Sequence, residues 1–144
     1  MKLVSACLAG IPCRFDGKAK PSAAAQTLVA SGRALAVCPE QVGGLPTPRP
    51  AAEIAGGDGS DVLAGTARVV TAAGADVTEH FINGARAAAQ RAVDAGVEEA
   101  LLKSKSPACG CTRIFDGTHS GRLKEGHGVF AAALKERGIR VTEV

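Results

Sequence analysis

Three short apolar segments of the sequence each lead to a cysteine in the residues that follow. Short apolar runs bounded by glycine, proline and polar residues are typical of buried strands. Helical patterns lie between them, and this alternation is typical of a parallel sheet. We therefore predict an α/β fold, a single domain over residues 1–144 with a mostly parallel, Rossmann-like sheet flanked by helices. The segments and their cysteines are residues 2–6 with Cys7, residues 34–37 with Cys38 and residues 99–103 with Cys109.

Three other stretches have helical character, and the last residues have the character of a strand. The helices are predicted over residues 21–31, 77–95 and 128–137, and the strand over residues 140–144. The middle helix is the clearest, because Asp76 and Glu79 have the spacing of a capping box at its start. Gly96 is expected to end it.

The remaining segments are predicted to be weakly structured. Residues 38–50 contain four prolines and two glycines, so regular structure is not expected there. Residues 112–128 are predicted to be a glycine-rich loop. Residues 53–72 are expected to form a hairpin, because Asp58-Gly59 has the composition of a turn. Its two strands would be residues 62–63 and 68–71.

Composition excludes some classes of function. The chain is 46% hydrophobic but has no apolar run long enough for a membrane span. Its net charge is only +3, and its four aromatic residues are all phenylalanine, which disfavours nucleic-acid binding by base stacking. The apolar stretch before Cys7 is too short for a signal peptide, so a cytoplasmic location is expected.

The five cysteines point to metal binding or catalysis rather than to disulfides, because the cytoplasm keeps thiols reduced. Ligands of parallel sheets bind outside the carboxyl ends of the strands. Cys7, Cys38 and Cys109 follow three such ends, so we expect their thiols to share one crevice. Any one of them taken alone could instead be a small buried hydrophobic residue.

The spacing of the cysteines bears on which metal they would hold. Structural zinc sites usually have four ligands in paired C-x2-C knuckles, which are absent here. Three soft thiolates suit an iron–sulfur cluster and would leave one iron open as a Lewis acid. Two alternatives stay open. One is a zinc or iron–sulfur module with a structural or sensing role, and the other is a redox protein that uses Cys109 and Cys111.

Several polar residues lie near these cysteines in the sequence. Glu40 follows Cys38 by two residues, and a carboxyl group shielded from water there could pass protons. Ser104 and Ser106 offer hydroxyl groups near Cys109. Three cations could hold anionic or carbonyl groups, or could be solvated, and these are Arg49, Lys103 and Lys105. The sequence assigns no role to Cys13, Cys111, His119 and His127.

Three blocks of sequence occur in a fixed order. They are residues 4–17 (VSACLAGIPCRFDG), residues 38–40 (CPE) with 43–49 (GGLPTPR), and residues 103–110 (KSKSPACG) with 115–117 (FDG). These blocks resemble the thiouracil desulfidase family, and the likeness runs over nearly the whole chain.

The resemblance implies a cofactor, a reaction and a set of site residues. The cofactor would be a 4Fe–4S cluster held by Cys7, Cys38 and Cys109, with one iron not ligated by the protein. The sulfur of a thiolated pyrimidine, of the 2- or 4-thiouracil type, would bind that iron. Water would then replace the sulfur at carbon without net redox change, with Glu40 as acid/base and Ser106 assisting. Whether the substrate is a base, a nucleoside or a nucleotide stays open.

Overall fold

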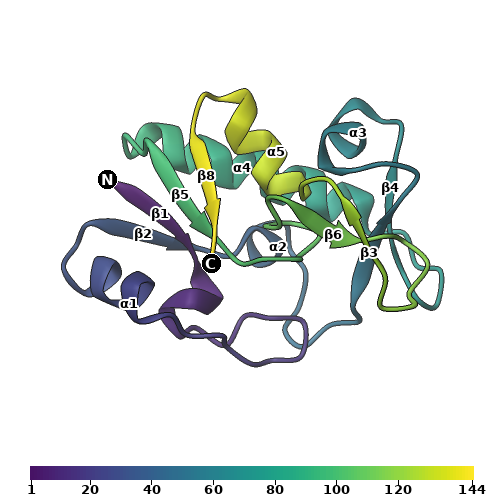
Figure 1. Cartoon of the computed structure of the whole chain (residues 1–144), viewed down its shortest axis with the longest axis horizontal. Coiled ribbons are helices and arrows are strands. Elements are labelled where there is room, and N and C mark those ends of the chain that lie inside the picture. Colours follow the sequence, from purple (N-terminus) through teal and green to yellow (C-terminus); the bar gives the residue numbers. More distant parts are fainter.

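Four parallel strands form the central sheet of the computed structural model, which describes residues 1–144 (Figure 1). In order across the sheet they are β2 (Ala34–Val37), β1 (Lys2–Ser5), β5 (Glu99–Leu102) and β8 (Arg140–Glu143). β1 pairs with β2 on one side and with β5 on the other, so Lys2 lies opposite both Ala34 and Glu99. The predicted α/β fold with a parallel sheet is therefore confirmed.

Helices cover both faces of this sheet. They are α1 (Ala23–Ala30), α4 (Thr78–Asp94) and α5 (Val129–Glu136). Leu3 belongs to the same buried core as Phe130 of α5, whereas Val4 packs on the opposite face with Ala25 of α1. Because neighbouring side chains of a strand point to opposite faces, burial of both faces explains the continuous apolar runs. No helix combines the length and the apolarity that a membrane crossing requires.

The three helices lie where the sequence predicts them, but α4 begins differently. Val77 is the N-cap residue of α4, and no side chain caps the helix. Asp76 stands one residue earlier, and its Oδ1 accepts a hydrogen bond from the backbone N–H of Thr78 at 2.9 Å. The predicted capping box of Asp76 and Glu79 is therefore wrong, because the chain turns into the helix one residue later than the box requires.

The predicted hairpin over residues 53–72 is half right. Its strands are β3 (Ala52–Ala55) and β4 (Arg68–Thr71), which pair in antiparallel orientation. Helix α3 (Gly59–Ala64) lies between them, so residues 62–63 are helical rather than extended. The reason is a capping box: Asp58 accepts from the backbone at the third helical residue, and Asp61 accepts from the Asp58 N–H.

The proline-rich segment contains a short helix that the sequence analysis missed. Helix α2 (Pro39–Val42) begins directly after β2, with proline in its first turn, where no amide hydrogen is needed. It packs closely against α4, because glycines stand at the contact: Gly43 follows the last residue of α2, and Gly84 lies within α4. A Cβ added to Gly43 would lie 2.0 Å from the carbonyl oxygen of His80, and one added to Gly84 would lie 2.0 Å from that of Pro39.

The segment 112–128 is not a loop throughout, since it folds into a hairpin. Its strands are β6 (Arg113–Phe115) and β7 (Leu123–Glu125). Glu53 of β3 fastens this hairpin, because its Oε1 accepts from the backbone N–H of Gly117 at 3.0 Å and of His119 at 3.1 Å. Strands this short depend on such tertiary contacts, so no local pattern predicts them.

Candidate active site

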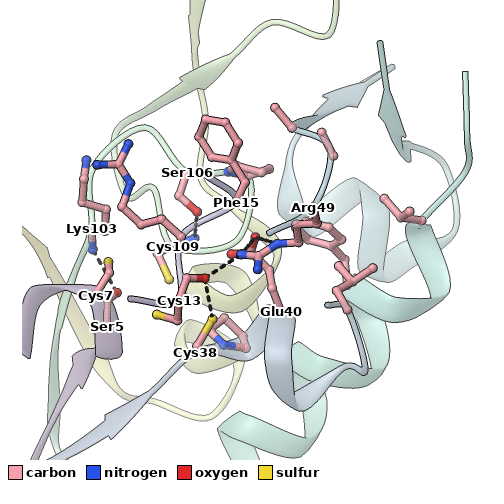
Figure 2. A pocket seen from close by; sticks show the side chains of 18 of the residues that line it. Ser5, Cys7, Cys13, Phe15, Cys38, Glu40, Arg49, Lys103, Ser106 and Cys109 are labelled. Atoms are coloured by element: carbon pink, nitrogen blue, oxygen red, sulfur yellow. Dashed lines mark hydrogen bonds and ion pairs between the residues drawn. The ribbon is translucent and has the colours of Figure 1, made fainter. Parts of the chain in front are cut away.

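A cavity of about 670 Å³ opens at the carboxyl ends of β1, β2 and β5. Cys7, Cys38 and Cys109 all line it, together with Glu40 and Ser106 (Figure 2). The strand order places β1 between β2 and β5, so the three strand exits are neighbours. The structure thus brings together all five residues that the sequence analysis singled out for the site.

Each of the three cysteines sits in a tight local structure. Cys7 lies in the short 3₁₀ helix η1 (Ala6–Ala9), which follows β1 directly. Cys38 is the N-cap residue of α2. Cys109 lies in a turn, in which the backbone N–H groups of Ala108 and Cys109 donate to Ser106 Oγ at 3.1 and 3.0 Å. Ser106 therefore shapes the turn that presents Cys109.

A fourth thiol lines the same cavity, and sequence reasoning missed it. Cys13 is only 3% exposed, and its side chain lies between those of Cys7 and Cys38 in Figure 2. It stands in a loop rather than at a strand exit, so the rule that located the other cysteines does not apply to it. Its carbonyl oxygen accepts from Cys38 Sγ at 3.7 Å.

The thiols differ in how readily they ionise. Hydrogen bonding with the Cys13 side chain is the main cause that lowers the pKa of Cys38 to about 7, and it also lowers the pKa of Cys7. The same hydrogen bonds, first that with Cys38, raise the pKa of Cys13 itself, which therefore stays protonated. Burial raises the pKa of Cys109 well above its ordinary value.

Glu40 forms a buried ion pair with Arg49. The guanidinium donates to Glu40 Oε2 through Nη2 at 2.7 Å and through Nε at 3.1 Å, and no protein donor reaches Oε1. The two side chains are 15% and 4% exposed, so Glu40 is not a solvated loop carboxylate. Burial raises the pKa of Glu40 and outweighs the opposing effect of Arg49.

The other donors of Arg49 are also used within the protein. Nη2 donates to the carbonyl oxygen of Cys13 at 3.0 Å, and Nη1 donates to that of Pro46 at 3.2 Å. The Arg49 backbone N–H donates to the carbonyl oxygen of Phe15 at 2.8 Å. Arg49 is therefore neither solvated nor available to a substrate anion, and its role is to hold the walls of the cavity together.

The remaining polar candidates have separate positions. Lys103 lines the cavity and donates to the carbonyl oxygen of Ser104 at 3.0 Å, and burial lowers the pKa of Lys103. Cys111 lies outside the cavity lining, and burial raises the pKa of its thiol to about 11. His127 contacts Ser60 Oγ at 3.1 Å, and His119 lies 3.6 Å from the Glu53 carboxylate. Neither histidine lines the cavity.

The donor set of the cavity fits an iron–sulfur cluster. Thiolate sulfur is the ligand that such clusters use. No three His, Cys, Asp or Glu side chains lie at the spacing that a single metal ion requires. Cys7, Cys38 and Cys109 instead line one cavity of about 670 Å³, which has room for a group larger than one ion.

Comparison with known proteins agrees with this assignment. The family model described as 2-thiouracil desulfurase matches residues 3–144. An uncharacterized protein of Bacillus subtilis (strain 168), YbbK, is 48% identical over 141 residues, which are 98% of this chain and 93% of that protein. The solved structure of TudS, a [4Fe-4S]-dependent thiouracil desulfidase, is similar with a TM-score of 0.86 and 44% identity, over 99% of this chain and 89% of that one.

The buried ion pair predicts that two arginine substitutions lower the free energy of unfolding by very different amounts. Arg49→Met leaves the Glu40 carboxyl buried without a partner, and breaking such a pair on one side costs about 3–5 kcal/mol. We expect a loss of that order in the free energy of unfolding, measured by urea unfolding followed by circular dichroism. Arg68→Met is the control, since Arg68 pairs with Asp76 at 3.7 Å on the surface, where a pair contributes about 0–1 kcal/mol. Equal losses would contradict the role given to Arg49.

Proposed function

Because this chain belongs to the 2-thiouracil desulfurase family of enzymes, we propose that it removes the sulfur of a thiolated pyrimidine. The substrate would be of the 2- or 4-thiouracil type, as a base or a nucleoside. Water would replace sulfur at the ring carbon, so that C=S becomes C=O and sulfide leaves, without net redox change. The observation that carries the proposal is the convergence of three strand-end thiols and one buried carboxyl group on a single cavity.

We further propose that Cys7, Cys38 and Cys109 hold a 4Fe–4S cluster, one iron of which has no protein ligand. Two observations support this ligand set: the three thiols line one cavity, and the similar protein TudS is [4Fe-4S]-dependent. When bound, such a cluster supplies a Lewis-acidic iron with affinity for the thiocarbonyl sulfur. In this proposal residues 1–144 form one iron–sulfur desulfidase domain, because both ends of the chain contribute strands to the sheet that carries the site.

Glu40 is proposed as the acid/base group. Replacing sulfur by the oxygen of water requires that both protons leave the water and that the departing sulfur gains protons. A carboxyl group with a raised pKa can take a proton from water and give it to sulfur near neutral pH. Arg49 holds Oε2 with both of its bonds to Glu40, so Oε1 is the atom free to exchange protons with water.

Ser106 is proposed to assist by donating a hydrogen bond to the substrate. Its Oγ already accepts from two backbone N–H groups, which fixes the oxygen and leaves the hydroxyl hydrogen for a substrate atom. The apolar part of the cavity suits the faces of a flat ring. Its largest apolar residues are Phe15, Leu45, Val77, Phe81 and Phe115.

Turnover of thiouracil tests the proposed function directly. Protein reconstituted with iron and sulfide without oxygen should convert 2- or 4-thiouracil to uracil, with one sulfide released for each uracil formed. Uracil is measured by chromatography and sulfide by colorimetric assay. A sample that contains iron and labile sulfide but releases no sulfide from either compound would overturn the proposal.

The ligand set predicts which cysteines the cluster requires. Cys38→Ala should abolish the visible absorption of the cluster after anaerobic reconstitution, because only two of the proposed ligands remain. Cys111→Ala is the control and should keep most of the absorption, since Cys111 lies outside the cavity lining. Retention of a full cluster in Cys38→Ala would show that the ligands are wrongly assigned.

The acid/base role predicts a variant that keeps its cluster but loses turnover. Glu40→Gln should keep the cluster absorption, whereas kcat should fall about 10²–10⁴-fold, the usual contribution of a general acid/base. Glu79→Gln, on the exposed side of α4, should leave kcat unchanged. Wild-type turnover in Glu40→Gln would refute the role of this carboxyl group.

A further inference from the structure

The buried thiol of Cys13 has no part in the proposed chemistry, although it lies inside the site. Cys13 is 3% exposed and shares a small buried core with Cys7, against which Cys38 also packs. Figure 2 shows its side chain between those of Cys7 and Cys38, the first two proposed ligands. A cysteine in this place is either a fourth ligand or a group that acts on the ligands.

The backbone around Cys13 is held firmly by hydrogen bonds. Its N–H donates to the carbonyl oxygen of Ile11 at 2.8 Å, which closes a tight turn. Its carbonyl oxygen accepts from Arg49 Nη2 at 3.0 Å. The unligated Cys38 thiol also donates to this oxygen at 3.7 Å, a weak bond that it gives up when it binds iron as a thiolate. Because Arg49 is itself tied to Glu40, Cys13 has a position determined by the same network that holds the proposed acid/base group.

The chemistry of the three neighbouring thiols assigns the proton to Cys13. Cys7 and Cys38 would bind a cluster as thiolates, which accept hydrogen bonds but cannot donate them. A buried thiol that binds no metal keeps its proton, and the Cys13 side chain, which lies between the other two, is placed to donate it.

We propose that Cys13 is a positioning residue, whose protonated thiol donates S–H···S hydrogen bonds to the ligand sulfurs of Cys7 and Cys38. The inference rests on the proposed function, which needs one iron without a protein ligand. If Cys13 bound iron, four cysteines would complete the coordination and no position would be left for the substrate. As a donor, Cys13 instead leaves the substrate position free.

Hydrogen bonds to ligand sulfurs have measurable consequences apart from turnover. They withdraw electron density from the thiolates, and this raises the reduction potential of an iron–sulfur cluster. They also hold the ligands in place, so the cluster should be lost more slowly when air is admitted. Removal of the donor should reverse both effects and leave the number of ligands unchanged.

The test compares Cys13→Ala and Cys13→Ser with the wild-type holoenzyme, and Cys111→Ala is the control. Iron and labile sulfide content, the midpoint potential and the half-life of the visible absorption in air are measured for each protein. We expect unchanged iron content in all of them. Cys13→Ala should show a more negative potential and a half-life several-fold shorter than that of the wild type. Cys13→Ser should keep the wild-type half-life and show a more positive potential, because its O–H group is the stronger donor.

Two results would overturn the inference. Loss of iron in Cys13→Ala would identify Cys13 as a ligand, and wild-type potential and half-life in both variants would exclude the hydrogen bonds. If Cys13→Ala does not fold, the potential of Cys13→Ser still decides, since a stronger O–H donor must shift it positively. Failure of the proposed function looks different, because the wild-type holoenzyme would then release no sulfide whatever the Cys13 variants show.

Discussion

The buried guanidinium of Arg49 is the contact on which the geometry of the site depends. It reaches the Glu40 carboxylate at the start of α2 and the carbonyl oxygen of Cys13 in the loop after η1. Removing two charges from water is costly, and the attraction between them offsets this cost only when the geometry is good. The pair is therefore best understood as a device that fixes two loops relative to each other, so that the carboxyl group and the thiols face the same cavity.

Two further constraints keep that arrangement in place. The parallel sheet sets the order β2-β1-β5, which makes the exits toward Cys38, Cys7 and Cys109 neighbours. The close approach of α2 and α4 fixes the position of α2, which carries Glu40, because Gly43 and Gly84 leave no room for a Cβ at their contact. The cavity is thus bounded by elements from distant parts of the chain, which backbone pairing and close helix packing hold together with the Arg49 side chain.

The elements that sequence patterns do not predict have a common physical cause. The four central strands have apolar runs strong enough to be recognised, since both faces of the sheet are buried. Helix α2 and the hairpin of β6 and β7 are short, and short elements depend on their neighbours more than on propensity. At Asp58 two local signals compete, a turn with the following glycine and a capping box with Asp61. The structure shows that the box prevails and α3 forms.

The sequence by itself determined the parallel α/β sheet and the convergence of Cys7, Cys38 and Cys109, because strand periodicity and the rule for strand exits are local. It also singled out Glu40 and Ser106 through their nearness to these cysteines and the family blocks. Only the tertiary structure decided that Arg49 is buried against Glu40 and that Cys13 lies between two of the thiols. Arg49 lies nine residues from Glu40 and 36 from Cys13, so no periodic pattern connects them and only the folded loops bring them together.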